Sequence, residues 1–187
     1  MMHRAMRRKT KELTDKRKIN ELLSDQKVGY LGLFDEEGTY VVPLNFVWLD
    51  EKIYFHGSEQ GRKIDAIQED HRVCFTISQD FGTIANPVPA NIGTAYRSVM
   101  VFGHIRRLNT LEESTAALQA LLDKFVPGYF DAKLSPKHVD SYRSSLGSKT
   151  IVYCLEPDQI TAKEDTVEGK ELFYPGRKQQ DDLKEKG

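Results

Sequence analysis

Hydrophobic and polar positions divide the chain into short strand-like runs separated by a few helical segments. Apolar and polar residues that alternate along a short run are typical of a half-buried strand. This pattern predicts strands over residues 28–34, 39–48, 53–55, 72–78, 94–108, 150–155 and 159–162. Turns are expected at 35–38, 50–52 and 156–158. Residues 79–93, rich in Asn, Pro and Gly, are expected to form a long loop that serves as a flap or a subunit contact.

Helical spacing predicts helices over residues 14–26, 61–69, 112–125 and 136–145. Thr14 or Asp15 can cap the first helix, and Asn109 or Thr110 the third. Strands and helices do not alternate regularly, which excludes a doubly wound sheet. The order predicts a mainly β protein, a small closed or partly open barrel with helices packed outside.

Glycines interrupt several of these strands. Gly29 and Gly32 lie inside an apolar run, where glycine indicates a sharp bend or a closely approaching backbone, as at a barrel corner. Gly103 lies inside the longest predicted strand and is expected to kink it.

Composition and charge narrow the function classes. The 187 residues carry a formal net charge of −1 and are 39% hydrophobic, which fits one soluble domain with a real core. The balanced charge argues against nucleic-acid binding as the main function. No apolar run approaches the ~20 residues that span a bilayer, and no secretory signal is visible, so a cytoplasmic protein with no membrane partner is expected. Cys74 and Cys154, each in an apolar run, are expected to be buried reduced thiols.

The chain is expected to have three parts. Residues 1–13 form a basic arm that is flexible or packs on a partner subunit, with nucleic-acid binding as a weaker alternative. Residues 14–165 form the barrel domain. Residues 166–187 form a charged tail, of which 175–187 have a composition typical of disorder.

The clearest binding signal follows the strand at 53–55. Gly57 and Gly61 let the backbone approach a ligand closely, and Ser58 is a candidate N-cap. The free N–H groups and dipole of a helix start favour an anion, and Arg62 and Lys63 add positive charge. The segment therefore predicts a site for a phosphate monoester, although a solvated basic helix start would show the same residues. Neither a Walker loop nor a dinucleotide fingerprint is present.

A second signal lies in the strand at 39–48. Pro43 cannot donate to a ladder, so this strand is at an edge, at a bulge or beside something other than a strand. A flat ligand stacked on this backbone would fit, because free peptide groups and the Asn45 side chain could bond the polar rim of a heterocycle. The alternative is an ordinary edge strand.

Several motifs in a consistent order connect these two signals with a known family. Together they resemble the FMN-binding split barrels related to pyridoxamine 5′-phosphate oxidase, and most closely the branch that contains nitroimidazole-resistance proteins. The resemblance covers about residues 5–165. The motifs that carry it are Tyr40-Val41-Val42-Pro43-Leu44-Asn45-Phe46, Ile53-Tyr54-Phe55-His56-Gly57-Ser58, Gly61-Arg62-Lys63, Tyr96-Arg97-Ser98-Val99, Phe102-Gly103 and Arg7-Arg8.

The resemblance implies a six-stranded antiparallel split β-barrel that forms homodimers with FMN in two grooves between subunits. Val42, Pro43, Leu44, Asn45 and Phe46 would line the isoalloxazine. The ribityl chain and phosphate would contact His56, Gly57, Ser58, Gly61, Arg62 and Lys63. Tyr96, Arg97 and Ser98 would approach the flavin from the other subunit. The chain lacks the C-terminal substrate-phosphate motif of the family's oxidases, which argues against oxidation of pyridoxamine phosphate itself.

Two functions follow from this resemblance. The first is an FMN-dependent oxidoreductase acting on a small aromatic or nitro compound, in which the flavin carries electrons and the protein supplies position and electrostatics. The second is a flavin carrier or sensor without turnover, with haem binding as a variant. His71 and His104 are candidate proton donors, although surface or strand histidines are the commoner explanation. No His, Asp and Glu cluster has the spacing of a metal site.

Overall fold

The computed structural model describes residues 6–143, 147, 150–167 and 171–184. Its helices are α1 (Lys16–Asp25), α2 (Arg62–Glu69), α3 (Leu111–Phe125), α4 (Pro136–Ser141) and α5 (Gln179–Lys184). Short 3-10 turns lie at Lys9–Lys11 and Pro89–Asn91. Its strands are β1 (Val28–Asp35), β2 (Gly38–Asn45), β3 (Val47–Leu49), β4 (Lys52–Gly57), β5 (Arg72–Ile84), β6 (Gly93–Arg107) and β7 (Ile151–Asp165).

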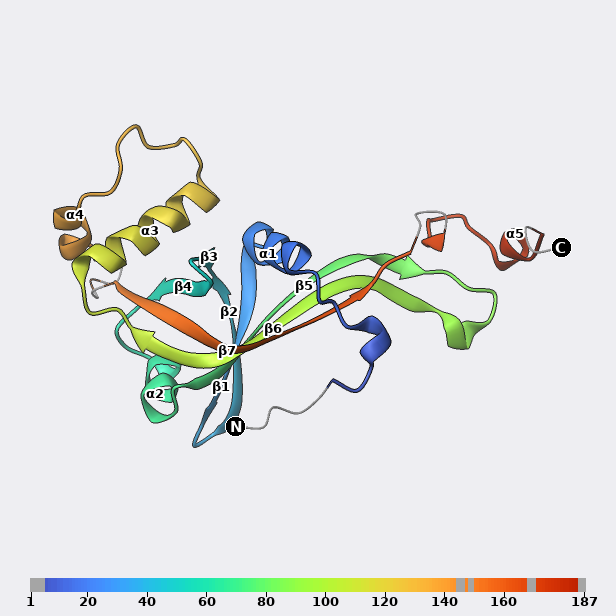
Figure 1. Cartoon of the computed structure of the whole chain (residues 1–187), viewed down its shortest axis with the longest axis horizontal. Coiled ribbons are helices and arrows are strands. Elements are labelled where there is room, and N and C mark those ends of the chain that lie inside the picture. The colour runs from blue at the N-terminus through green and yellow to red at the C-terminus, as the bar shows by residue number, and fades with distance from the viewer. Residues whose placement is uncertain (1–5, 144–146, 148–149, 168–170, 185–187) are drawn as a thin grey trace.

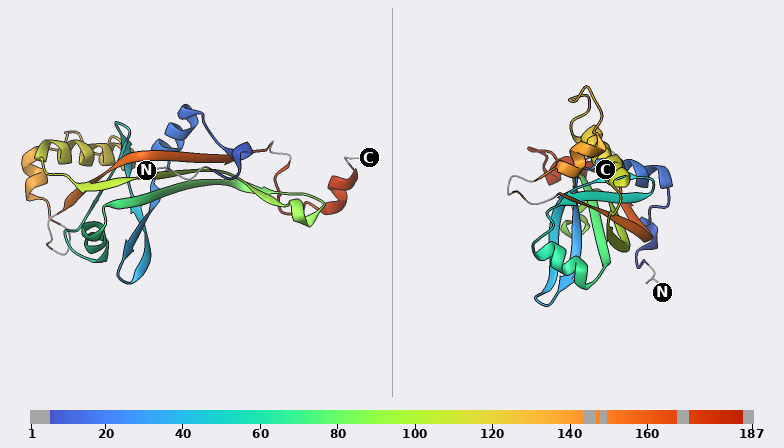
Figure 2. Two further views of the ribbon diagram at one scale, coloured as in Figure 1. Left: turned by 60° about the horizontal axis from the view of Figure 1, so that its bottom comes forward. Right: turned by 90° about the vertical axis from the view of Figure 1, so that its left-hand side faces the viewer.

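The seven strands of the described chain form one antiparallel sheet in the order β2-β1-β5-β6-β7-β4-β3. The two edge strands, β2 and β3, follow each other in the chain and are separated only by Phe46. The sheet therefore curls until its edges come near each other without pairing, as Figures 1 and 2 show. This confirms the predicted mainly β split barrel with helices outside, although the sheet has seven strands where six were expected.

Packing in the core explains why β2 ends before Phe46 and β3 begins after it. The Phe46 side chain is fully buried and meets the Phe75 ring edge-on, with centroids 5.1 Å apart. Phe55 and Tyr153, from the paired strands β4 and β7, stack at 5.4 Å. Each such burial contributes about 1.5–3 kcal/mol. Turning Phe46 inward carries the chain from one edge of the sheet to the other.

A smaller apolar cluster lies outside the barrel, where α3 packs against β3, β4 and β7. Thr110, one of the two predicted candidates, caps α3, with its hydroxyl accepting a bond from the Glu113 N–H. The fully buried members of this apolar cluster include Cys154 and Ala117. The helix thus covers the side of β4 that faces away from the core, and the Tyr54 side chain points toward it.

Lys124 ties α3 to the end of α1. Its ammonium donates to the carbonyl of Gln26 at 2.6 Å and lies 4.1 Å from the centre of the Phe46 ring. These contacts satisfy a carbonyl at the helix end that α1 itself leaves open. Burial lowers the pKa of Lys124 to about 8.

Two predicted irregular segments are regular in the structure. Residues 156–158 do not form a turn but lie inside β7, where Asp158 is the extra residue of a bulge opposite Phe102 and Gly103. A bulge is one of the few places where a sheet accepts proline, and Pro157 lies there. Residues 79–84 likewise continue β5 through a bulge at Phe81, so the predicted loop begins only after Ile84.

β5 and β6 therefore project from the barrel as a long arm (Figures 1 and 2). The C-terminal tail runs along this arm, where the Phe173 N–H donates to Thr83 and the Gln179 side chain donates to Pro87. The expectation of disorder is wrong for 175–184, which include α5; residues 185–187 lie outside the described residues.

The described part of the N-terminal arm lies against its own barrel. The Leu13 N–H donates to Ala162 of β7 at 2.9 Å, and Lys11 pairs with Asp165. Asp15 caps α1, as one of the two predicted candidates. Residues 1–5 lie outside the described residues. Within the described ranges, no helix has the length and apolar composition needed to cross a membrane.

Gly103 provides a test of the bulge. A Cβ atom added to Gly103 would lie 2.1 Å from the Glu156 carbonyl oxygen, which is backbone and cannot rotate away. We expect Gly103→Ala to lower the free energy of unfolding by about 1–3 kcal/mol, measured by urea denaturation. The matched control is Gly93→Ala in the same strand, whose Cβ would meet only the end of Ile84 at 3.8 Å. Equal stability of the two variants would contradict this account of the bulge.

Candidate functional site

The end of β4 and the start of α2 form a compact polar corner beside the barrel. Gly61 adopts φ 112° and is the N-cap of α2, a conformation that glycine adopts without strain. Ser58, the candidate N-cap, instead accepts a hydrogen bond from the Gln60 N–H within the preceding turn. Gly61 has no side chain to cap the helix, and the N–H groups of Ile64 and Asp65 donate to its carbonyl, so the N–H groups of Arg62 and Lys63 are the ones that an anion could use.

Lys63 folds back from this helix over the end of β4. A Cβ atom on Gly57 would lie 3.0 Å from the Lys63 ammonium, so the absence of a side chain at Gly57 makes room for the lysine. The ammonium also lies 5.6 Å from the centre of the Phe55 ring. Burial lowers the pKa of Lys63 below its ordinary value of 10.5, and the ammonium lies half-buried beside the cradle that Gly57 leaves open.

His56 lies on the other side of the same strand end. His56 is an exposed residue, and its partial desolvation by the surrounding protein, followed by the neighbouring Lys63 charge, lowers the pKa of His56 below its ordinary value of 6.5. The imidazole is therefore mostly neutral at pH 7 and can both donate and accept a hydrogen bond.

Arg62 points away from Lys63 and is engaged by the β1–β2 hairpin. Its Nε donates to Asp35 at 2.6 Å, and a second nitrogen lies 3.2 Å from Glu37. The guanidinium also lies 4.5 Å from the centre of the Tyr40 ring. Arg62 thus fixes α2 against β1 and β2, and these carboxylates compete with any phosphate for it.

β2 is an edge strand, which confirms one of the placements expected for Pro43. Pro43 lies opposite Tyr30 of β1, and in the described chain no strand pairs with the other edge of β2. Leu44 and Phe46 face the core, whereas Pro43 and Asn45 are exposed. The Arg62–Tyr40 contact and the packing of β2 against β4 bring this strand and the polar corner to one side of the barrel.

Tyr96, Arg97 and Ser98 do not join this region within one chain. They lie near the start of β6, where it leaves the barrel toward the arm, while α2 lies toward the opposite end (Figure 1). Arg97 faces the inside of the sheet, and its Nε donates to Glu164 of β7 at 2.7 Å. Lys18 pairs with the same carboxylate at 2.8 Å, so Arg97 belongs to an internal charge network.

Other candidate groups lie apart from the corner. Cys74 and Cys154 are free thiols, and burial raises the pKa of both, which makes them poor nucleophiles. His104 lies on the outer face with its Nδ1 2.7 Å from Asp158, and His71 is exposed. Among the described residues, no group of three or more His, Cys, Asp or Glu is placed to hold a metal ion.

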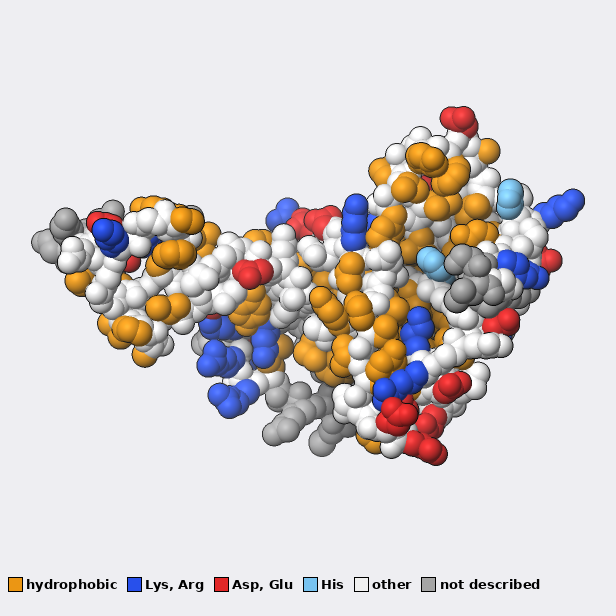
Figure 3. Space-filling view, turned by 180° about the vertical axis from the view of Figure 1, so that it is seen from behind, with side chains coloured by type: hydrophobic (Ala, Val, Ile, Leu, Met, Phe, Trp, Pro, Cys, Tyr) orange, Lys and Arg blue, Asp and Glu red, His pale blue; other side chains and the backbone are white. Residues whose placement is uncertain are grey.

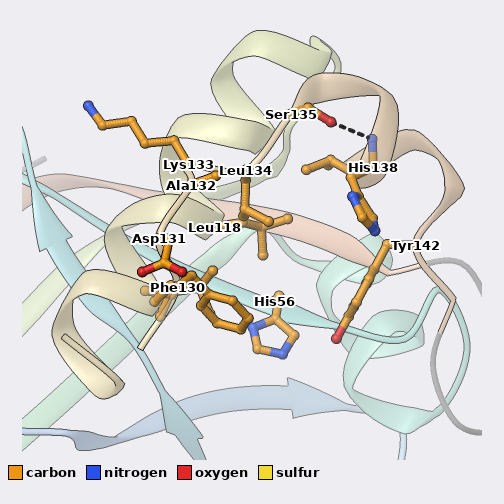
Figure 4. Close-up of a pocket in the computed structure, with 13 residues that line it drawn as sticks. His56, Leu118, Phe130, Asp131, Ala132, Lys133, Leu134, Ser135, His138 and Tyr142 are labelled. Carbon is orange, nitrogen blue, oxygen red and sulfur yellow. Dashed lines mark hydrogen bonds between the residues drawn. The ribbon is translucent and has the colours of Figure 1, made fainter. Parts of the chain in front are cut away.

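The sequence alone did not reveal an apolar cavity of about 500 Å³ next to His56 (Figure 4). It lies between β4, α3, α4 and the connection from α3 to α4. Residues 130–135 are the part of that connection that lines it. The signal that could have indicated it is the pair Tyr129 and Phe130, two aromatic residues directly after the Pro127-Gly128 stop. The Asp35 and Glu37 partners of Arg62 were also missed, because the pattern placed them in a surface turn.

Comparison with known proteins identifies the relatives of this architecture. The family model described as pyridoxamine 5′-phosphate oxidase matches residues 15–164. No curated protein matches the chain. The fold is similar to a putative 5-nitroimidazole antibiotic resistance protein from Bacteroides thetaiotaomicron, with 25% identity, a TM-score of 0.63, and coverage of 81% of this chain and 85% of that one.

Two further solved structures share the fold at lower identity. The flavocytochrome Anf3 from Azotobacter vinelandii has 20% identity and a TM-score of 0.73, covering 92% of this chain and 79% of that one. The FAD and haem binding protein from Mycobacterium smegmatis has 19% identity and a TM-score of 0.69, covering 95% and 80%.

The Asp35–Arg62 pair predicts a specific pH dependence of stability. The hydrogen bond from Arg62 lowers the pKa of Asp35 below its ordinary value of 3.8. The stabilisation is therefore present above that value and is lost as the pH falls through the lower pKa of the folded protein. We expect Asp35→Asn to lower the melting temperature at pH 7 and to differ less from the wild type at pH 3, measured by thermal unfolding. Glu36→Gln, in the same turn, is the control; a pH-independent difference for Asp35→Asn would contradict the pairing.

Proposed function

The chain belongs to the pyridoxamine 5′-phosphate oxidase family, and from that premise we propose that it is an FMN-binding oxidoreductase. Its proposed substrate is a small aromatic or nitro compound, and its proposed working form is a homodimer. One observation carries the proposal: the Lys63 ammonium, the Gly57 cradle and the start of α2 meet beside the open edge of β2.

The polar corner suits the FMN phosphate. A half-buried ammonium, the uncapped N–H groups of a helix start and a glycine that leaves room for close approach match a dianion. Lys63 is the direct phosphate partner in this proposal, with His56, Gly57, Ser58 and Gly61 along the ribityl chain and phosphate. Arg62 positions the helix through Asp35 and Glu37 and adds to the local positive potential.

The edge of β2 suits the flavin ring. From Val42 to Phe46 the strand has neighbours on one side only, so its outer peptide groups can bond the polar edge of the isoalloxazine. The exposed Asn45 amide supplies both a donor and an acceptor. Donors at that edge stabilise the negative charge of a reduced flavin.

A second copy of the chain would complete the site. The outer face of the sheet exposes Val28, Tyr30, Phe34, Val41 and Met100, with relative exposures from 38% to 64%. Monomeric proteins seldom expose so many apolar side chains on one face. The proposed partner covers this face and brings its own Tyr96, Arg97 and Ser98 to the flavin, since these residues lie away from the polar corner of their own chain.

Flavin chemistry fits what the protein itself offers. When bound, the flavin supplies the electron transfer, and the chain supplies binding, orientation and exclusion of water. Cys154 is buried and Cys74 is partly buried, and both thiols have raised pKa values, so neither is an activated sulfur nucleophile. The similarity to a putative nitroimidazole resistance protein favours a nitro compound as the oxidant.

The phosphate assignment predicts a difference between two flavins. We expect Lys63→Ala to weaken FMN binding roughly 10- to 100-fold, because a charge-assisted hydrogen bond contributes about 1.5–3 kcal/mol. Riboflavin, which has no phosphate, should lose much less affinity. Binding is measured by quenching of flavin fluorescence, and Lys52→Ala, which alters a lysine at the start of β4, is the control. Equal losses for FMN and riboflavin would refute the assignment.

The dimer is expected to depend on the apolar outer face. In analytical ultracentrifugation, the FMN-loaded wild type should sediment as a dimer, and Tyr30→Glu combined with Met100→Glu should shift it toward monomer. Charges placed on an apolar interface remain unpaired and disfavour association. A wild-type monomer that holds FMN with full affinity would remove the proposed role of Tyr96 to Ser98.

Turnover separates an enzyme from a carrier. An oxidoreductase should be reduced by NADH or NADPH and then reoxidised by a nitroaromatic compound under anaerobic conditions, followed at the flavin absorption bands. A protein that binds FMN but accepts electrons from neither nucleotide would favour the carrier function.

A further inference from the structure

The cavity beside His56 has the size and lining of a small-molecule site. Its volume of about 500 Å³ lies within the range of ~300–1,000 Å³ that is usual for ligand pockets. Three leucines of α3 form one wall, and the connection and α4 form the other (Figure 4). The lining residues are His56, Leu118, Leu121, Leu122, Phe130, Asp131, Ala132, Lys133, Leu134, Ser135, His138, Val139 and Tyr142.

Large apolar side chains around this cavity are exposed. Phe130 is 56% exposed and Tyr142 is 51% exposed, and both line the cavity. Tyr129 packs edge-on against Phe130 at 5.0 Å and is itself 76% exposed. Figure 3 shows hydrophobic side chains gathered at this end of the molecule together with histidine. Exposed aromatic rings at the rim of an apolar cavity favour a ligand that stacks on them.

Hydrogen bonds hold the cavity wall in place. The Leu134 N–H donates to the Gln119 side chain of α3 at 2.7 Å. Ser135 caps α4 by accepting a bond from the His138 N–H, and Pro136 occupies the first helical turn. These contacts fix the connection against α3 and set the direction of α4, so the cavity does not need a ligand to form.

The polar groups of the cavity favour a neutral ligand. The lining includes one carboxylate, Asp131, and one ammonium, Lys133, whose formal charges sum to zero. His56 is mostly neutral at pH 7, since partial desolvation lowers its pKa. Apart from its two imidazoles, the lining of this cavity therefore carries no net formal charge, and the imidazoles and the Tyr142 phenol can bond a nitro, carbonyl or hydroxyl group.

We propose that this cavity is a second ligand site, which adjoins the flavin site at His56, and that it binds a neutral aromatic molecule with polar substituents. The ring lies among the α3 leucines and Phe130, and the substituents reach the imidazoles. His56 joins the two sites, because it follows Phe55 on β4 and precedes the Gly57 cradle. The site is formed by one chain and does not require flavin.

The test uses the full-length protein stripped of flavin and two matched probes. These are neutral 4-nitrobenzyl alcohol and anionic 4-nitrobenzoate, each titrated by calorimetry. We expect the alcohol to bind and the benzoate to bind at least ~10-fold more weakly, which corresponds to about 1.4 kcal/mol. No binding of the alcohol, or tighter binding of the benzoate, would overturn the proposal.

A substitution that fills the cavity with a larger side chain tests whether the ligand binds there. Ala132 is exposed and lines the cavity, so Ala132→Trp should occupy the space without disturbing the core. We expect it to weaken binding of the alcohol at least ~10-fold and to leave FMN affinity and the melting temperature unchanged. Ala116→Trp, on an exposed position of α3 that does not line the cavity, is the control. Unchanged binding in Ala132→Trp would overturn the location.

The same preparation distinguishes other outcomes. If FMN fails to bind while the alcohol binds as described, the flavin proposal fails and the cavity proposal stands. If the alcohol binds only in the presence of FMN, the ligand lies on the flavin and the cavity proposal fails. If haemin binds with a spectrum of two histidine ligands that His138→Ala abolishes, the cavity holds haem and the assigned ligand class is wrong.

Discussion

The structure depends on one constraint: the two edge strands of the sheet are neighbours in the chain, so the sheet must curl on itself around Phe46. Turning this ring into the core against Phe75 closes the barrel by packing instead of by hydrogen bonds. β2 and β3 therefore approach without pairing, and among the described strands none pairs with the outer edge of β2. A fully closed barrel would have used that edge for its own ladder and left no peptide groups for a ligand.

The two cationic side chains at the start of α2, Arg62 and Lys63, have different partners. Arg62 and Lys63 are adjacent in the sequence, yet one is bound by carboxylates of the β1–β2 hairpin and the other folds over a glycine. Successive helix positions point about 100° apart, so a pair of this kind divides naturally between two faces. The result is a fixed helix and a half-buried ammonium, which together make the start of α2 a better anion site than two exposed cations would be.

The exposed apolar surface has two separate parts. One is the outer face of the sheet, where Tyr30 and Met100 lie in register across neighbouring strands through Thr76. This broad face suits another protein surface. The other is the cavity beneath α3 and α4, which is concave and bordered by aromatic rings, and therefore suits a small molecule. Curvature, more than composition, distinguishes the two.

Local patterning was enough to predict most strands and the main helices, and to narrow the caps of α1 and α3 to two candidates each and Pro43 to an edge, a bulge or a non-strand neighbour, because each depends on residues a few positions apart. The family resemblance further indicated the split barrel. Local patterning was not enough where residues far apart in the chain decide the local structure or the partner of a side chain. Pro157 looked like a turn, but Gly103 on the facing strand provides the space that lets β7 continue through it. Arg62 looked free for phosphate, but Asp35 reaches it only once β1 lies beside α2. The sequence by itself determined where most strands and helices lie and which segments carry charge. The tertiary structure alone decided which strands pair, which charges are already neutralised and where packing leaves a hollow, since all three depend on contacts between residues far apart in the chain.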